Sequence, residues 1–380
     1  MRLVQASPFA PIPGPLAVLH QAIDPPLING ARKPLKEGGY TDSGADIAAA
    51  LRGIGIPVVT PGKLPDPACD DGWTFPDTAD GIAGARERGA RVLWANTVLF
   101  EGHPLEAVRG VRIVGQRPAD VHRFDDKWQA RNIMLAAGLP FPAAVLVGAV
   151  AAPGVVSMRA VDDPLLERLG MRHGAIVKPV RGRGSQGVTF APSAAEAREA
   201  LSVLFATTSP AAEGPVPVYG DRAIVEAFLP GEEITVAVFP PGAYRFRERI
   251  RSERSHWALP VIRRTGHAAG IAPYSGAVPV SVNSETLTAG EGARVEVAAA
   301  VAACVHAAAL IGARAPVRID CRRSEAGSFQ LFDVNLKPNL TGPGRPGREQ
   351  AESLVSLAGR AAGWSYPEML CELLRGSWVS

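Results

Sequence analysis

Two strand-like runs near the C-terminal end constrain this 380-residue chain more than any other part of its sequence. Arg318 and Asp320 lie in the first run, and Asp333 and Asn335 end the second. Side chains two apart on a strand share a face, so Arg318 and Asp320 point the same way. Mg²⁺ prefers oxygen ligands and fills its remaining positions with water and substrate phosphate. The two runs therefore predict that Asp320, Asp333 and Asn335 bind a hard cation, beside an arginine that can hold an anion.

The length of the chain predicts two or three domains. Hydrophobic residues make up 47% and charged residues 20%, which is an ordinary globular balance. The net charge of +3 is too small to indicate nucleic-acid binding. Residues 295–311 are apolar, but they are mostly alanine and include Glu296 and His306, so they predict a buried helix rather than a membrane span. We therefore expect neither a nucleic-acid partner nor a membrane partner.

The four cysteines are widely scattered, and no C-x-x-C pair occurs among them. This spacing indicates neither a zinc knuckle nor a disulfide framework. Reduced thiols are typical of the cytoplasm. The first residues, Met1–Gln5, lack the apolar core of a signal peptide. A cytoplasmic location is the expectation.

Strand and helix signals alternate over about the first 120 residues. Short apolar runs predict strands, and apolar residues at helical spacing predict helices. The expected strands are 16–19, 56–59, 92–95 and 111–114, and the expected helices are 43–53 and 81–89. Alternation of this kind predicts an α/β domain.

The organisation changes after Asp125, where strands dominate. Asp125 or Asp126 can cap a helix that runs through Leu135. Strands are expected at 175–178, 188–190, 223–226 and 235–239, and helices at 193–205, 291–311 and 351–374. This pattern predicts an α+β fold.

Residues 181–188 contain the pattern G-x-G-x-x-G, which has several interpretations. A dinucleotide fingerprint needs a helix directly after the glycines, whereas residues 188–190 predict a strand. A protein kinase carries its lysine on a later strand, whereas Lys178 precedes this loop. A β-hairpin lid would cover phosphates with its backbone N–H groups, above Lys178. A lid and an ordinary exposed turn both remain open.

Two more segments suggest nucleotide binding, each with a plainer alternative. Lys127 begins a helix, where a cation is unfavourable unless an anion lies between it and the helix end; otherwise it is a surface lysine. Residues 225–233 can form a hinge that binds a purine edge, with Glu233 accepting from ribose hydroxyls. The alternative for 225–233 is an edge strand with a charged turn.

Three segments are candidates for substrate binding. Alternation in 244–251 places its arginines, including Arg249, on one strand face. Three interpretations of this face remain open: a solvated surface, a binding site for a substrate carboxylate, or a nucleic-acid patch. Tyr274 and His267 lie in a segment that can form a loop that binds an acceptor substrate. The Pro- and Gly-rich run 335–348 carries Arg345 and Arg348, which can hold a carboxylate at two points, or it is a rigid surface loop.

The order of these motifs resembles the ATP-grasp superfamily, and specifically its D-alanine–D-alanine ligase-like branch. The resemblance spans roughly residues 120 to 350 and rests on Asp126-Lys127, Val177-Lys178-Pro179 with the glycine loop, Val225–Leu229 with Glu233, Arg318-x-Asp320 and Asp333-Val334-Asn335. It implies an α/β N-terminal domain followed by an α+β ATP-grasp fold in which two subdomains clasp ATP. The implied ranges are 1–122 for the N-terminal domain, 123–230 for the small subdomain with the lid, and 231–380 for the C-terminal subdomain with the metal and substrate sites.

The resemblance also implies roles for individual residues. Catalytic roles fall on Arg318, Lys178 and Gly187. ATP binding falls on Lys127, Lys178, Gly182, Gly184, Ser185, Gln186, Glu226, Ala227, Phe228, Leu229, Glu233 and Phe332. Metal binding falls on Asp320, Asp333 and Asn335. Substrate binding is expected of Asn339, Thr341, Gly344, Arg345, Arg348, Arg249 and Tyr274.

The implied reaction uses ATP and two Mg²⁺ ions, with Mn²⁺ as a substitute. A substrate carboxylate is phosphorylated, and an amine then displaces phosphate from the acyl phosphate. The implied partners are a small carboxylate and a small amine, and a homodimer is compatible with the resemblance. An ATP-binding protein without ligation, and a kinase that stops at phosphorylation, are the alternatives.

Two features differ from the pattern of the branch. The branch usually has glycine near the position of Asn339. D-alanine–D-alanine ligases also carry an early acidic residue in a Ser-rich turn, and none is found from Ile28 to Ser43. The sequence therefore leaves open whether D-alanine is a substrate.

Overall fold

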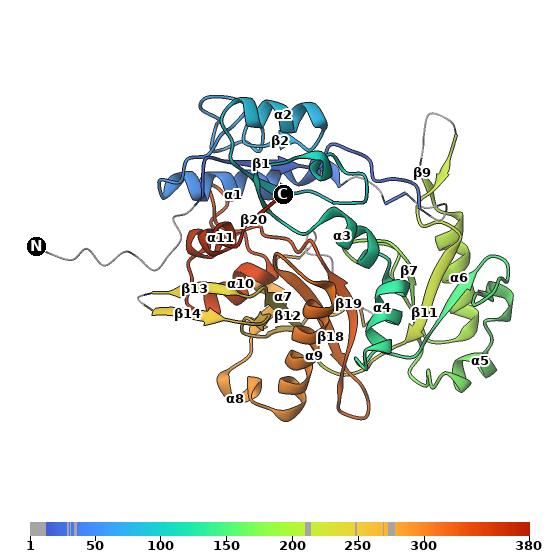
Figure 1. Cartoon of the computed structure of the whole chain (residues 1–380). Coiled ribbons are helices and arrows are strands. Elements are labelled where there is room, and N and C mark those ends of the chain that lie inside the picture. The colour runs from blue at the N-terminus through green and yellow to red at the C-terminus, as the bar shows by residue number, and fades with distance from the viewer. Residues whose placement is uncertain are drawn as a thin grey trace, which may run out of the picture.

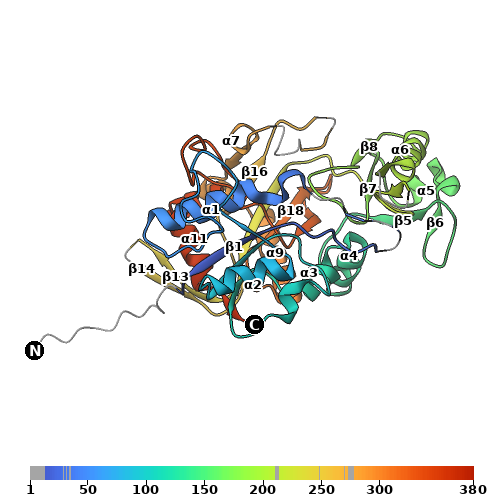
Figure 2. The same cartoon turned by 90° about the horizontal axis from the view of Figure 1, so that it is seen from above.

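The computed structural model describes residues 13–28, 30, 32–33, 36–209, 214–247, 249–268, 270–272 and 278–380. Three large sheets organise this part of the chain (Figure 1). Figure 2 shows the second sheet, with its helices α5 and α6, projecting to one side of the other two. The three sheets fall within the three ranges expected for the domains, apart from the last strand, which returns to the first sheet.

The first sheet is mainly parallel and has the strand order β2-β1-β3-β4-β20. Its strands are β1 (Leu16–His20), β2 (Phe75–Pro76), β3 (Val92–Asn96), β4 (Arg112–Val114) and the antiparallel β20 (Trp378–Val379). Its helices are α1 (Thr41–Gly53) and α2 (Ala79–Glu87), with short 3-10 turns η1 (Glu37–Tyr40) and η2 (Pro104–Ala107). The expected strand 56–59 is reduced to a single bridge between Val58 and Leu16, because prolines at 57 and 61 cannot donate to a ladder.

The second sheet has the order β6-β5-β11-β7-β8. Its strands are β5 (Ala144–Gly148), β6 (Val156–Ser157), β7 (Ala175–Pro179), β8 (Thr189–Ala191) and β11 (Arg222–Ala227). Helices α5 (Asp163–Arg168) and α6 (Ala194–Ala206), a 3-10 turn η3 (Met158–Ala160) and a small hairpin β9 (Thr208–Ser209)–β10 (Val216–Pro217) complete this unit. Because β7 and β8 are antiparallel neighbours, the glycine loop between them is the tip of a β-hairpin, as expected.

The third sheet is antiparallel and has the order β17-β16-β12-β18-β19, with β15 also paired to β12. Its strands are β12 (Glu233–Phe239), β15 (Trp257–Ala258), β16 (Ile262–Arg264), β17 (Ser284–Thr286), β18 (Val317–Arg323) and β19 (Phe329–Asn335). Helix α9 (Val295–Ile311) packs on one face, where Ile234, Val236, Ile319 and Leu331 are buried. The opposite face carries the alternating polar residues.

The remaining helices join these layers. They are α3 (Pro118–Phe124), α4 (Lys127–Ala136), α7 (Val280–Asn283), α8 (Ala289–Gly292), α10 (Leu354–Ala361) and α11 (Tyr366–Arg375). Although 123–230 was expected to form one subdomain, α4 packs against β19 and buries Met134 in the core of the third sheet. Among the described residues, no helix combines the length and apolarity needed to cross a membrane.

The arginine-rich segment 244–251 is not the single strand that was expected. It spans β13 (Gly242–Phe246) and β14 (Arg249–Glu253), which pair as an antiparallel hairpin. Arg247 has a φ of 52° at the turn. Because the chain reverses direction there, alternation cannot place all of its arginines on one strand face.

Candidate functional site

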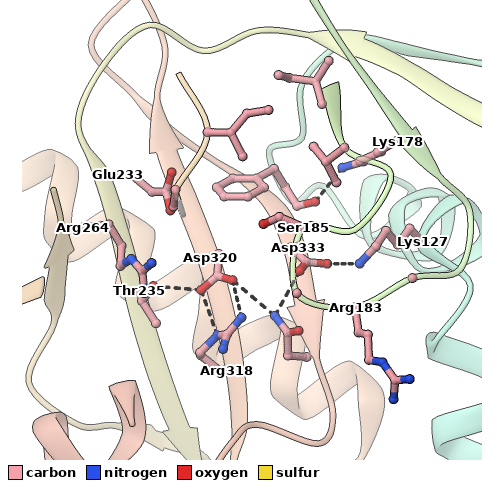
Figure 3. A pocket seen from close by; sticks show the side chains of 18 of the residues that line it. Lys127, Lys178, Arg183, Ser185, Glu233, Thr235, Arg264, Arg318, Asp320 and Asp333 are labelled. Atoms are coloured by element: carbon pink, nitrogen blue, oxygen red, sulfur yellow. Dashed lines mark hydrogen bonds and ion pairs between the residues drawn. The ribbon is translucent and has the colours of Figure 1, made fainter. Parts of the chain in front are cut away.

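The centre of the site is a square of four side chains on two paired strands. Asp320 of β18 pairs with Asp333 of β19, and Arg318 pairs with Asn335. Since residues two apart share a face, all four side chains lie on the face opposite α9. Figure 3 shows Arg318 and Asp320 side by side at the floor of the cavity. The register of one strand pair therefore brings together the residues of the predicted metal site.

Arg318 and Lys127 hold the two carboxylates. Arg318 donates to Asp320 through Nε and Nη2, at 3.1 and 2.8 Å, and Thr235 Oγ1 donates to Asp320 at 2.8 Å. Lys127 Nζ donates to Asp333. Burial raises the pKa of Asp333, but Lys127, Lys178 and Arg318 outweigh it and lower that pKa to about 2. Asp333 is therefore ionised at neutral pH.

Helix α4 positions Lys127 at this point. Asp126 caps the helix by accepting from the Gln129 N–H at 2.8 Å. The Lys127 N–H donates to Val180 O at 3.0 Å, next to the glycine loop. Burial lowers the pKa of Lys127, but Asp333 first and then Asp125 and Asp320 outweigh it, so the net shift is upward. The cation at the helix start thus faces carboxylates across the cavity.

Lys178 approaches the same cavity from the second sheet. Its Nζ lies 2.6 Å from Glu226 Oε1 and 2.9 Å from Phe332 O, so it joins β7, β11 and β19. Lys178 and Glu226 are 6% and 4% exposed. Two buried opposite charges must be paired, since either alone would be costly. Lys178 therefore has a fixed position beside Asp333 rather than a surface position.

Residues 226–229, predicted as a hinge, line the cavity between the second and third sheets. The Phe228 ring packs at 4.7 Å from the Phe190 ring and lies under the Arg322 guanidinium. Glu233 Oε2 lies 2.9 Å from His267 Nε2. His267 therefore lies at this end of the cavity.

The glycine loop forms one wall of the cavity. Gly182, Gly184, Ser185 and Gln186 line it. Gly184 and Ser185 adopt the left-handed conformation, with φ of 55° and 59°. Gly187, expected to be catalytic, is not part of the wall; its φ is 71°, and a Cβ there would lie 3.0 Å from the Tyr219 ring. Its position is explained by the turn and not by contact with reacting groups.

The two lysines, the strand-pair residues, residues 226–229 and the glycine loop line one cavity of about 270 Å³. The donor set at its floor is two carboxylates and one amide, and the described residues hold no cluster of three or more His, Cys, Asp or Glu side chains suited to a metal. Mg²⁺ binds through one or two carboxylates plus substrate phosphates, so this set fits it. Asn335 Nδ2 donates to Asp320 and Asp333 at 3.3 and 3.2 Å. Turning that amide would present its oxygen to the same point.

Most of the residues expected to bind substrate lie elsewhere. Arg345 is buried and donates to Asp46 at 2.9 Å, to Asp70 and to Cys69 O at 2.7 Å. Arg348 also pairs with Asp46, at 3.0 Å. The expectation that these arginines hold a substrate carboxylate is corrected, because the carboxylate that they bind belongs to α1.

The neighbours of these arginines are structural as well. A Cβ on Gly344 would lie 2.1 Å from Asp46 O, so this glycine allows the loop to approach α1. Thr341 donates to Asn339 Oδ1 at 2.9 Å and is buried. Neither Gly344 nor Thr341 lines the cavity, whereas Asn339 does.

Two further expectations concern Arg249 and Tyr274. Arg249 is exposed on the β13–β14 hairpin and does not line the cavity, so its expected substrate role is corrected. The hairpin lies on the far side of α10 from the second sheet (Figure 1). Tyr274 lies outside the described residues.

The cavity also has lining residues that the sequence did not single out. They include Lys36, Tyr40, Arg264, Lys337, Ser353 and Leu354. Arg264 reaches the cavity because β16 pairs with β12, opposite Glu233. Burial lowers the pKa of Arg264. Lys337 was identifiable only by its position two residues after Asn335, whereas Lys36 and Tyr40 gave no local signal.

The comparisons with known proteins agree with this geometry. No protein-family model matches the chain. It is 28% identical over 250 residues to a D-alanine–D-alanine ligase of Halorhodospira halophila, covering 66% of this chain and 65% of that protein. It is 25% identical over 249 residues to a D-alanine–D-alanine ligase of Gloeobacter violaceus, covering 66% and 68%. The chain thus spans about two thirds of these relatives.

Solved structures extend the likeness to nearly the whole chain. The D-alanine–D-alanine ligase of Bacillus anthracis complexed with ATP matches with a TM-score of 0.60 and 14% identity, over 94% of both chains. The D-alanine–D-alanine ligase from Coxiella burnetii matches with a TM-score of 0.62 and 14% identity, over 94% of this chain and 93% of that one. The chain therefore has the ATP-grasp fold. Within that class, its resemblance to the D-alanine–D-alanine ligase-like branch is confirmed.

Proposed function

We propose that this protein is an ATP- and Mg²⁺-dependent ligase that joins a carboxylate to an amine. The observation that carries the proposal is the convergence of Lys127, Lys178, Arg318 and the Asp320–Asp333 pair on one cavity. Phosphoryl transfer depends on positioning and charge neutralisation more than on covalent help. Cations and carboxylates from both subdomains supply these conditions at one point.

The proposed reaction has two steps. A substrate carboxylate oxygen attacks the γ-phosphorus of ATP, which gives an acyl phosphate and ADP. An amine then attacks the acyl carbon, phosphate leaves, and the amine loses a proton. Asp320, Asp333 and Asn335 would hold a divalent ion, which would supply positive charge to offset that of the phosphates.

The residues of the chain have separate tasks in this scheme. Lys127 and Lys178 would bind the phosphates, and Arg318 would stabilise charge on the transferring group. Residues 226–229 and Glu233 would hold the nucleoside. The glycine loop would exclude water, which otherwise hydrolyses an acyl phosphate. Four free cysteines suit a reducing compartment such as the cytoplasm.

The test is to measure release of ADP and phosphate in the presence of ATP, Mg²⁺ and a panel of carboxylates and amines. D-alanine belongs in the panel because it is named in the relatives. We expect ADP and phosphate in equal amounts, with an amide product detected by mass spectrometry. A phosphorylated product that needs no amine would identify a kinase. Release of AMP, or no nucleotide binding, would contradict the proposal.

A further inference from the structure

One end of the cavity is lined by three basic side chains. Lys36, Arg183 and Lys337 line it, and they come from the loop before α1, the glycine loop and the loop after β19. All three surround Tyr40. Lys36 Nζ lies 4.8 Å and Lys337 Nζ 3.3 Å from the centroid of the Tyr40 ring, and Arg183 Nη1 donates to the Tyr40 hydroxyl at 3.4 Å.

Lys337 differs from the other lysines around the cavity. Lys127 and Lys178 each contact a carboxylate, and Lys36 pairs with Asp42 at 2.9 Å. Within the described part of the chain, the side-chain nitrogen of Lys337 has no ion-pair or hydrogen-bond partner, and it lies over the face of Tyr40. A cation–π contact repays only a part of the desolvation of an ammonium group. Burial and then the neighbouring Lys36 lower the pKa of Lys337. Among the described residues no carboxylate is paired with this side chain to offset that, and an anion entering the cavity would supply the missing partner.

The loop that carries Tyr40 and Lys36 is built into the first sheet. Gly38, Gly39 and Tyr40 are all left-handed, with φ of 69°, 54° and 70°. A Cβ on Gly39 would lie 2.1 Å from Gln21 O, at the end of β1. Asn96 Nδ2, at the end of β3, donates to Tyr40 O at 2.9 Å. This loop thus lies where the carboxyl ends of two parallel strands meet, a usual place for ligands in such sheets.

Lys337 is placed by the metal-site strand itself. It follows Asn335, the last residue of β19, by two residues. An anion held by Lys337 would therefore lie beside the carboxylates that face the transferring phosphoryl group. That position belongs to the substrate whose carboxylate is activated, and not to the nucleoside, which would lie at the other end near residues 226–229.

We propose that the activated substrate carries a second anionic group, a carboxylate or a phosphoryl group, which Lys337 binds with Lys36 at the Tyr40 end of the cavity. This inference rests on the proposed ligase function. It assigns Lys337 as a specificity-determining residue. The chain would thus select a dianionic acid over an acid whose other end is neutral or carries an ammonium group.

The experiment uses the full chain with ATP, Mg²⁺ and hydroxylamine, which traps an acyl phosphate as a hydroxamate. Four acids of one length differ only in their far end: succinate, 3-phosphonopropionate, butyrate and β-alanine. We expect kcat/KM for the two dianions to exceed that for butyrate and β-alanine by about 10- to 100-fold, the scale of a charged hydrogen bond. Comparing succinate with 3-phosphonopropionate separates the two possible anions.

Substitution of Lys337 tests the assignment directly. Lys337→Met should remove most of the preference by raising KM for the dianions, while leaving ATP affinity within about 2-fold because no phosphate-binding group changes. Lys337→Glu should favour β-alanine. Lys63→Met, at an exposed lysine away from the cavity, is the matched control. Equal activity on all four acids, or an equal loss on all four in Lys337→Met, would overturn the proposal.

Failure of the ligase function would be seen separately. If no acid gives a hydroxamate or ADP, the proposed function fails, and binding of succinate and 3-phosphonopropionate is then measured by calorimetry in the presence of a non-hydrolysable ATP analogue. If the wild-type protein binds these anions and Lys337→Met does not, the proposed anion site stands even though the ligase function fails. Absence of binding, or equal binding in both proteins, would reject the site as well.

Discussion

The two ends of the cavity differ in how their charges are held. At the proposed nucleotide end, each cation contacts a carboxylate: Lys178 contacts Glu226 on the next strand, Lys127 of α4 contacts Asp333, and Arg318 contacts Asp320 on its own strand. At the substrate end, Arg345 and Arg348 turn away to Asp46 of α1, while Lys337 faces the cavity. The nucleotide end is thus set by strand register, and the substrate end by a contact between distant parts of the chain.

This difference predicts how substitutions at each end of the cavity affect the protein. A square of residues on two paired strands keeps its geometry as long as the strands keep their register. The loop after β19 is not paired in a sheet, and the buried pairs of Arg345 and Arg348 with Asp46 attach it to α1. We therefore expect substitutions at the nucleotide end to affect chemistry first, and substitutions around Asp46 to affect stability first.

The largest effect is expected for Lys178 at the nucleotide end. Lys178→Met should weaken ATP binding by about 10- to 100-fold, since a charged hydrogen bond to phosphate is lost, whereas Arg183→Met should change it by less than about 5-fold. The measurement is calorimetric titration with a non-hydrolysable ATP analogue. Because Lys178→Met leaves Glu226 buried without its partner, the double variant Lys178→Met, Glu226→Gln is the control. Equal losses for Lys178 and Arg183, or recovery of binding in the double variant, would remove Lys178 from the phosphate site.

The sequence analysis grouped the residues at the proposed nucleotide end of the cavity but misplaced several at the substrate end. The strand patterns at 317–323 and 329–335 put Arg318 with Asp320 and Asp333 with Asn335 on one face of each strand, and the register of the two strands then brings the two pairs together. Lys127 and Lys178 were grouped with them by the order of motifs. These predictions needed only local periodicity and the resemblance.

The predictions failed where tertiary contacts decide direction. The sequence of 335–348 gives no sign that Arg345 meets a carboxylate about 300 positions earlier, because a loop has no periodicity to fix its side chains. The prediction that the arginines at 244–251 share one strand face was wrong for a related reason, since the turn at Arg247 breaks the alternation. Tyr40 and Lys36 were missed because only the pairing of β1 with β3 brings their loop to the cavity.

A smaller effect, on stability, is expected at Asp46. Asp46 is fully buried and bridges two arginines. Asp46→Ala should lower the free energy of unfolding by about 2 kcal/mol, because the buried Arg345 guanidinium loses its buried carboxylate and keeps only Asp70 and backbone oxygens as partners. Urea unfolding at neutral pH measures this, with Asp70→Ala as a control, since the Asp70 side chain is 48% exposed. A loss below about 1 kcal/mol for Asp46→Ala would mean that the substrate loop keeps its path without this pair.

A third prediction concerns pH at the nucleotide end. The folded-state pKa of Asp333 is depressed to about 2, below the unfolded value of about 4. Its contribution to stability is therefore fully present above about pH 4 and is lost as pH falls toward about 2, and it is on the order of 2 kcal/mol. Lys127→Met should reduce stability at pH 6 and have less effect at pH 3. An effect of Lys127→Met that does not change between these pH values would show that the pair does not set the Asp333 pKa.

The smallest effect is expected for Arg249, which the sequence suggested as a substrate residue. Arg249 is exposed on the hairpin, and an exposed substitution of this kind changes stability by no more than about 0.5 kcal/mol. Arg249→Ala should also leave kcat/KM for every carboxylate within about 2-fold of the wild-type value, whereas Lys337→Met should not. Arg249→Ala removes a basic side chain outside the cavity, and Lys337→Met removes one inside it. The difference between their kcat/KM values therefore measures how strongly the effect of a basic residue depends on its position in the fold. A tenfold loss in Arg249→Ala would instead bring the hairpin into the substrate site, and would mean that local alternation had identified the substrate end after all.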